Sequence, residues 1–287
     1  MKSSPLYLVL RELRLEHTLF ALPFAYVGAI LAAHGLPTLY QFVWITLAVI
    51  GARTAAMAAN RYLDRDIDAR NPRTARRALA TGRLSPGAML AAAVSGLALL
   101  VVSAFALNPL CVALIPIAAL GIGLYPFCKR WGWWTHFVLG AVDGLAPLGA
   151  YVAVAGKFSL PAFLIFFAVT IWVAGFDIIY ALMDRDVDLA QNLQSIPARF
   201  GEASGRRVPI LLHVAMMLLL ALAGTLAQVG PLYYLGIALA AGLAWYEDRL
   251  FDLSKNVFIL NERVFVSNMV FAVAFLATTL GGFVWHG

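Results

Sequence analysis

Asn60-Arg61-Tyr62-Leu63-Asp64-Arg65-Asp66-Ile67-Asp68 follows a long apolar run and ends it abruptly in charge. A near copy, Asp184-Arg185-Asp186-Val187-Asp188, follows another apolar run 120 residues later. In each copy the first and last aspartates are four positions apart, so a helix would place both on one face, one turn apart. Two such helix ends facing each other would hold four converging carboxylates at a membrane surface.

The composition indicates a membrane protein that crosses the bilayer many times. Of 287 residues, 62% are hydrophobic and 13% are charged, whereas soluble domains carry about 25% charged residues. The net charge of +6 is explained by basic loops on the cytoplasmic side. We therefore expect a lipid bilayer and no nucleic acid among the partners. No small-residue cleavage site follows the first apolar run, so we expect no removable signal peptide.

Apolar runs near the length of a membrane span divide the chain. They predict an all-α membrane protein of nine transmembrane helices, with residues 1–287 forming a single domain. Residues 1–16 mix charged side chains with leucines, which predicts an interfacial amphipathic helix. The predicted spans are 17–34, 40–60, 87–107, 110–127, 135–155, 160–182, 208–228, 231–246 and 264–285.

The distribution of basic residues predicts the orientation. The N-terminal segment and the loops after the second, fourth, sixth and eighth spans hold nearly all of the Lys and Arg residues, whereas Lys157 alone is basic in the opposite loops. Because basic loops stay in the cytoplasm, we expect a cytoplasmic N-terminus and an external C-terminus. We take a bacterial inner (plasma) membrane as the location.

Two polar stripes are predicted to run inward from the cytoplasmic face. A helical period aligns Arg53, Asn60 and Asp64 on one face, and Asp177, Tyr180, Asp184 and Asp188 on another. Arg53 and Asp177 would lie about 10 Å inside their spans. A charged side chain at that depth costs at least ~2.5 kcal/mol unless it meets a partner or a polar cavity. The stripes therefore predict a polar cavity.

The residue types predict which ligands such a cavity would bind. Clustered carboxylates repel one another unless a hard divalent cation relieves the repulsion, and Mg²⁺ commonly completes its coordination with phosphate oxygens. Basic side chains suited to phosphate lie on the same rim: Arg73, Arg76, Arg77, Lys129, Arg130 and Arg199. With apolar walls beyond them, an isoprenoid diphosphate bridged by Mg²⁺ fits both halves of the site.

Each feature also has a simpler interpretation. One Asp-Arg-Asp cluster at a helix end is most simply solvated, but two matching clusters that continue polar stripes favour a functional site. We expect Asp66, Asp186, Arg65 and Arg185 to be solvated. Tyr125 lies on the face of Lys129 and is explained almost as well by a position at the membrane interface.

The motifs resemble those of the UbiA superfamily of intramembrane prenyltransferases. Asn60-x3-Asp64-x3-Asp68 is similar to its first aspartate-rich motif and Asp177-x2-Tyr180-x3-Asp184-x3-Asp188 to its second. The segments 125–130 and 195–201 resemble the end of its fourth helix and the loop after the second motif. The resemblance covers essentially the whole chain and implies nine helices arranged around a central cavity. Within the superfamily, segments 16–23 and 68–74 look most like bacterial 4-hydroxybenzoate polyprenyltransferases.

The resemblance and the stripes together lead to a hypothesis for the site. It transfers a polyprenyl group from polyprenyl diphosphate to a small aromatic acid in quinone biosynthesis, with Mg²⁺ as cofactor. The metal ligands are Asp64, Asp68, Asp184 and Asp188, with Asn60 assisting. The catalytic residues are Asp177, Tyr180, Lys129 and Arg73. The substrate-binding residues are Arg53, Asn60, Arg77, Tyr125, Lys129, Arg130 and Arg199. For Arg53, a grip on the acceptor's carboxylate and an ion pair with Asp143 or Asp177 are equally good explanations.

Three other functions remain open. Relatives in the futalosine route to menaquinone would use a different aromatic acceptor. An ion-coupled membrane transporter could use the intramembrane acids, although the nearly uncharged far side argues against it. A CDP-alcohol phosphotransferase also uses clustered aspartates with Mg²⁺, but its Asp-Gly and Ala-Arg spacings are not found here.

Overall fold

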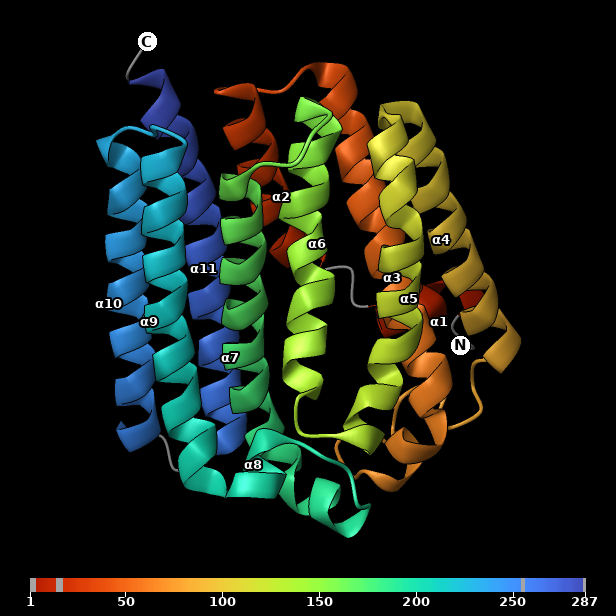
Figure 1. Ribbon diagram of the computed structural model, residues 1–287. Coiled ribbons are helices and arrows are strands. Elements are labelled where there is room, and N and C mark those ends of the chain that lie inside the picture. The colour runs from red at the N-terminus through yellow and green to blue at the C-terminus, as the bar shows by residue number, and fades with distance from the viewer. Residues whose placement is uncertain (1–3, 14–17, 254–255, 286–287) are drawn as a thin grey trace.

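The computed structural model describes residues 4–13, 18–253 and 256–285. These residues form eleven α-helices. Figure 1 shows the long helices side by side in one bundle, with the short α8 across one end. The helices are α1 Pro5–Leu13, α2 Thr18–Ala33, α3 Leu39–Arg70, α4 Pro86–Leu107, α5 Pro109–Trp131, α6 Thr135–Ala155, α7 Leu160–Ala190, α8 Ile196–Phe200, α9 Glu202–Leu226, α10 Pro231–Leu253 and α11 Val257–Val284.

Every predicted span coincides with a helix, but length and composition alone support fewer membrane crossings. Within the described residues, seven helices are long and apolar enough to cross a membrane, namely α3 to α7, α9 and α11. In α2 the apolar stretch Ala21–Ala33 is shorter. In α10 the second half carries Glu247, Asp248 and Arg249, which lowers its apolar character. The chain is an integral membrane protein of the all-α class.

The two longest helices of the bundle carry the two acidic motifs. Thr38 begins α3 with a reciprocal cap, in which its side chain accepts from Gln41 N while the Gln41 side chain accepts from Thr38 N. Ser159 caps α7 through a bond from Ala162 N. Both helices continue without interruption through their motifs, to Arg70 and Ala190. The predicted helical spacing of the aspartates is therefore confirmed.

Small residues bring the helices close together. A Cβ atom added to Gly140 on α6 would lie 2.0 Å from the Thr170 carbonyl oxygen on α7. Gly51 on α3 and Gly96 on α4 also face each other closely, since an added Cβ on either would meet the other's carbonyl oxygen at 2.7 Å. Helices in lipid associate through such close backbone contact. These contacts set the spacing of the helices around the site.

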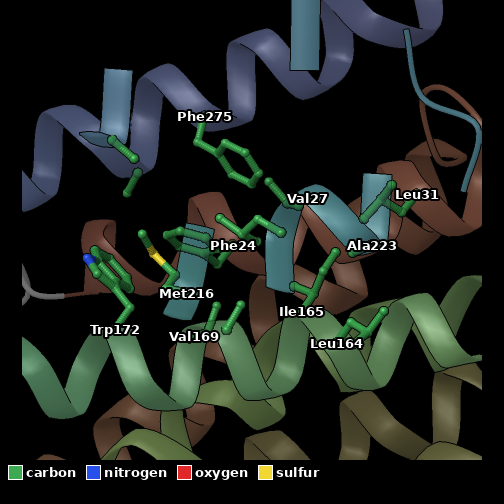
Figure 2. Close-up of a cluster of buried hydrophobic side chains, with 14 of the residues drawn as sticks. Phe24, Val27, Leu31, Leu164, Ile165, Val169, Trp172, Met216, Ala223 and Phe275 are labelled. Carbon is green, nitrogen blue, oxygen red and sulfur yellow. The ribbon is translucent and has the colours of Figure 1, made fainter. Parts of the chain in front are cut away.

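The largest apolar cluster lies on the other side of α7 and anchors that helix. Phe24 of α2, Trp172 of α7, Met216 of α9 and Phe275 of α11 meet in it (Figure 2). The Phe24 and Trp172 ring centroids are 4.7 Å apart. Aromatic pairs of this kind contribute about 0.5–1.5 kcal/mol of stability beyond that gained from their buried area. The face of α7 with Asp177 is thereby held toward α6.

The helix α1 lies within the segment 1–16 that is predicted to form an interfacial amphipathic helix, and residues 1–3 and 14–16 lie outside the described part. Its position at the membrane interface stays a prediction. Leu8 and Leu13 are buried against Ala58 of α3 and Met89 of α4. Arg11 is exposed on the other face. This segment packs on the helix that carries the first acidic motif.

Candidate active site

A polar cavity of about 350 Å³ lies between α3, α5, α6, α7 and α11, at the end of the bundle covered by α8. Twelve of the fourteen predicted site residues line it. They are Arg53, Asn60, Asp64, Asp68, Arg73, Arg77, Tyr125, Lys129, Asp177, Tyr180, Asp184 and Asp188. The predicted polar stripes of α3 and α7 thus face one space.

The carboxylates of the first motif are bound chiefly by cations from other parts of the chain. Lys129 Nζ of α5 lies 2.5 Å from Asp64 Oδ2, which also accepts from Asn60 Nδ2 at 3.0 Å. Arg77 Nη1 lies 2.5 Å from Asp68 Oδ2. Arg61 Nη1 approaches the same oxygen at 4.0 Å. Each carboxylate therefore has a cation of its own.

The second motif is bound from the loop that follows α3. Arg73 holds Asp184 with two nitrogens, Nε at 2.9 Å from Oδ1 and Nη2 in close contact with Oδ2. Asn71 Nδ2 adds a bond to Asp184 Oδ1 at 3.0 Å. Burial lowers the pKa of Arg73, but the bond to Asp184 and the charges of Asp184, Asp68 and Asp188 raise it to a net value above the ordinary one. Asp188 accepts instead from the Ser195 hydroxyl at 3.0 Å.

A histidine that the sequence did not single out joins the cavity to its cover. His136 of α6 is buried, and its Nδ1 lies 2.7 Å from Asp177 Oδ2. Its Nε2 accepts from Ile196 N, at the start of α8, at 3.1 Å. Because Nε2 is the acceptor, the proton of the neutral ring is on Nδ1 and is donated to Asp177. His136 thus fixes both Asp177 and the loop that carries Ser195.

The deepest charges form an ion pair at the floor of the cavity. Arg53 Nη1 donates to Asp143 Oδ1 at 3.0 Å. Of the two partners considered for Arg53, the structure selects Asp143. Both residues also border a second cavity, which is almost wholly apolar and runs between α3, α4, α5 and α6. The pair therefore lies where the polar space meets an apolar one.

Two predicted site residues lie outside the cavity lining. Arg130 reaches Asp64 from the outer side, with Nη2 3.5 Å from Oδ1, and donates to Leu63 O at 3.2 Å. Arg199 is exposed on α8, because this short helix turns it away from the bundle. As expected, Asp66 and Asp186 are solvated, with 73% and 96% of their side chains exposed.

The carboxylates of the cavity have the chemistry of a divalent-cation site but are not gathered into one. In the described part of the chain, no group of three or more acidic, His or Cys side chains lies together as a metal-binding cluster. The expected convergence of acids is not formed, because basic side chains separate them. The donor chemistry does fit: these are hard oxygen ligands, and Asp64 Oδ1 is buried without a hydrogen-bond partner among the described residues.

Comparison with known proteins gives a family match over most of the chain. Residues 21–269 match the UbiA prenyltransferase family. A 4-hydroxybenzoate octaprenyltransferase from Nitrosococcus oceani is 34% identical over 262 residues, which are 89% of this chain and 87% of the relative. Another, from Alkalilimnicola ehrlichii, is 36% identical over 227 residues, 78% of this chain and 76% of the relative.

Solved structures agree with this result. The apo structure of a UbiA homologue from Aeropyrum pernix is 34% identical and superposes with a TM-score of 0.82, covering 95% of this chain and 98% of that one. A UbiA homologue from Archaeoglobus fulgidus, bound to DMAPP and Mg²⁺, is 19% identical with a TM-score of 0.71, over 94% of this chain and 98% of that one. The second likeness shows the shared fold.

Proposed function

The chain belongs to the UbiA prenyltransferase family, and we propose that it transfers a polyprenyl group from polyprenyl diphosphate to 4-hydroxybenzoate. It is a membrane enzyme of prenyl transfer. The acceptor comes from the names of its relatives. A futalosine-route acceptor is the alternative within the same chemistry.

The observation that carries the proposal is the pairing of acids with bases around one cavity. Lys129, Arg77 and Arg73 neutralise Asp64, Asp68 and Asp184 in the structure. A diphosphate is a competing partner for the three cations, because phosphate oxygens accept charge-assisted bonds as carboxylates do. Its arrival would free carboxylates whose oxygens suit a hard divalent cation. A transporter has no evident need for bases and acids matched in this way.

Mg²⁺, when bound, would be held by Asp64, Asp68, Asp184 and Asp188 with Asn60 nearby, and would neutralise charge on the leaving diphosphate. The freed cations act on the same group: Lys129 and Arg73 stabilise the oxygen that leaves, and Arg77 holds the rest of the diphosphate. These bonds grow stronger as negative charge develops on that oxygen. They therefore accelerate cleavage of the carbon–oxygen bond.

Cleavage leaves the bonding electron pair on the diphosphate and an allylic cation on the prenyl group. The apolar helices exclude water, which would otherwise capture the cation. A ring carbon of the acceptor, next to the carbon that bears the activating hydroxyl group, then forms the new carbon–carbon bond, and the ring passes its proton to an oxygen of the released diphosphate. Asp177 and Tyr180 lie above the floor of the cavity, where they orient the two reactants. Tyr125 adds an aromatic wall to the same space.

Arg53 is proposed to orient the acceptor through its carboxylate. Its described hydrogen bond to Asp143 uses Nη1. A guanidinium has five N–H donors, so further donors can meet the acceptor's carboxylate. This places the acceptor ring at the floor of the cavity, beneath the diphosphate. Arg130 and Arg199, which lie outside the lining, are proposed to act on the diphosphate only from the rim.

The orientation in the membrane is also proposed. The acidic motifs and the basic loops share the end covered by α8, and we place this end in the cytoplasm, with the N-terminus, of a bacterial inner membrane. Nine crossings within a single domain over 1–287 remain part of this proposal. Cysteines introduced beside Lys157 should react with an impermeant reagent from outside, and those beside Arg76 should not.

The test of the function uses the purified protein in detergent. A series of prenyl diphosphates is supplied with ring-labelled 4-hydroxybenzoate, with Mg²⁺ or with EDTA. We expect one diphosphate released for each prenylated product, and no turnover in EDTA. Turnover in EDTA would refute the metal sites. Prenyl transfer to other aromatic acceptors but not to 4-hydroxybenzoate would refute the proposal that 4-hydroxybenzoate is the acceptor.

A further inference from the structure

A second polar cavity, of about 680 Å³, adjoins the catalytic one. We call it the vestibule. It lies between α1, the loop 71–85 and the first turns of α11. Arg61, Arg73 and Arg77 belong to its wall and also to the wall of the catalytic cavity. An anion in the vestibule would therefore be next to the cations of the active site.

The lining of the vestibule is strongly basic. Its acidic side chains are Glu12 and Glu262, and its basic side chains are Arg11, Arg61, Arg73, Arg76, Arg77 and Arg83. Glu12 is already engaged, because it accepts from Ala78 N at 2.5 Å and lies 3.6 Å from Arg61 Nε. Like charges gathered around one hollow attract an anion and repel cations. The mechanism above gives no role to the outer arginines of this set.

Arg76 and Arg83 are the outer pair that the loop holds together. Arg83 Nη2 donates to the carbonyl oxygen of Arg76 at 2.8 Å, and Arg83 Nε donates to Thr81 Oγ1 at 3.0 Å. Both arginines are exposed, and neither forms an ion pair with an acid in the described part of the chain. The bond places the guanidinium of Arg83 at the backbone of residue 76. The Arg83 guanidinium is thus held by the loop, and both arginines line the vestibule without an acidic partner in the described part of the chain.

The loop itself is anchored to the active-site helix. Thr74 Oγ1 donates to the carbonyl oxygen of Asp68 at 2.9 Å, and Thr74 is buried. Ala78 and Leu79 pack into the cluster that contains Leu8 and Met89. A site built on this loop is therefore preformed, which lowers the entropic cost of binding.

We propose that the vestibule is a second binding site for a phosphate-bearing anion, the diphosphate head of the prenyl donor, which Arg76 and Arg83 hold outside the catalytic cavity. The identity of this ligand rests on the proposed function. The donor's tail lies in the bilayer and its charged head at the surface, so the head must pass the rim to reach Lys129. From the vestibule the head can move to Arg73 and Arg77, which line both cavities.

The test measures binding of inorganic diphosphate to the purified full chain in EDTA, where no catalysis takes place. The variant Arg76→Gln/Arg83→Gln removes both outer charges and keeps side chains of similar length. The matched control is Arg207→Gln, an exposed arginine of α9 that borders none of the described cavities. We expect the dissociation constant to rise about 10-fold in the double variant, as for the loss of two partly solvated charge-assisted contacts. The control should bind like the wild type.

Unchanged binding in the double variant would overturn the proposal. So would an equal loss in Arg207→Gln, because the effect would then follow net charge alone. The assay does not depend on turnover. If the wild type binds diphosphate but makes no prenylated product, the proposed function is refuted and the vestibule site is not. If the enzyme is active but Arg76→Gln/Arg83→Gln binds diphosphate as tightly as the wild type, the vestibule site is refuted and the proposed function is not.

An anionic lipid headgroup shares the phosphate chemistry, and two further measurements separate the sources. If the donor's head is the ligand, the double variant should raise the KM for prenyl diphosphate several-fold without changing kcat. The wild type should also bind inorganic diphosphate equally well in phosphatidylcholine vesicles with and without phosphatidylglycerol. The change that phosphatidylglycerol causes in the double variant is subtracted, because it reports only the charge of the vesicle surface. If phosphatidylglycerol competes and the KM stays unchanged, the site belongs to a lipid headgroup and the role in donor entry is overturned.

Discussion

Replacing Asp143 by Asn tests the floor of the cavity. It removes one charge of the Arg53–Asp143 pair, whose atoms are 3.0 Å apart and whose side chains are 18% and 13% exposed. Removing one partner of a fully buried pair costs about 3–5 kcal/mol, because the other charge is left uncompensated. The slight exposure to the cavity lowers that cost, so we expect a loss of about 3 kcal/mol in stability.

The same change should improve binding of the acceptor. In the wild type, Asp143 competes with the acceptor's carboxylate for the guanidinium of Arg53. Asp143→Asn removes the competitor, so the KM for 4-hydroxybenzoate should fall several-fold while the KM for the prenyl diphosphate stays the same. Arg53→Lys should do the opposite to the acceptor, because an ammonium cannot form the paired bonds of a guanidinium.

The assays are thermal unfolding in detergent and steady-state kinetics with each substrate varied in turn. Arg53→Gln and the double variant Arg53→Gln/Asp143→Asn complete a cycle, and residues in direct contact should show a coupling of about 1–3 kcal/mol. Asp186→Asn is the control, since Asp186 is 96% exposed and pairs with Arg185 only at the surface. Additive effects on stability would refute the ion pair. An unchanged acceptor KM in Asp143→Asn would refute the role of Arg53 in binding and leave the pair purely structural.

Three further predictions concern separate parts of the molecule. Asp68→Asn should lower kcat at least ~10²-fold, whereas Asp66→Asn, on a solvated side chain, should be mild; equal losses would contradict the helical-face argument. His136→Ala leaves the buried Ile196 N without an acceptor and Asp177 without a donor, and should cost about 2 kcal/mol and much of the activity, while His136→Gln, which can still donate and accept, should restore part of both; equal damage would exclude the bridging role. Gly140→Ala should lower the unfolding temperature of the purified protein markedly, because its Cβ would meet a carbonyl oxygen at 2.0 Å, whereas Gly149→Ala on the same helix has open space; a similar effect of the two would show that close contact of α6 and α7 is not required.

The sequence by itself was sufficient for the class of protein, the places of the long helices and the two acidic faces. These features are local. The length of an apolar run, and aspartates four positions apart, depend on the geometry of a single helix. That is why Asp64 and Asp68, like Asp184 and Asp188, lie on the cavity side while Asp66 and Asp186 are solvated.

Predictions from the sequence were less reliable where a helix is only weakly apolar, and where a turn decides which way a side chain faces. The charges of α10 make its crossing ambiguous by composition, so the span count could not be settled from apolar runs. Arg199 was expected in the site because it follows the second motif. The turn between α7 and α8 instead leaves it exposed, and a turn of a few residues has no periodicity from which this direction could be read.

Tertiary structure alone decided which charges meet. Lys129 reaches Asp64 across 65 positions of sequence, and Arg73 reaches Asp184 across 111. His136, a lone histidine beside tryptophans, gave no local signal, yet it joins Asp177 to the backbone of Ile196. Such pairs form only where close contacts such as that of Gly140 with Thr170 bring separate helices to within bonding distance. The packing of several helices at once sets that distance, and no single stretch of sequence contains it.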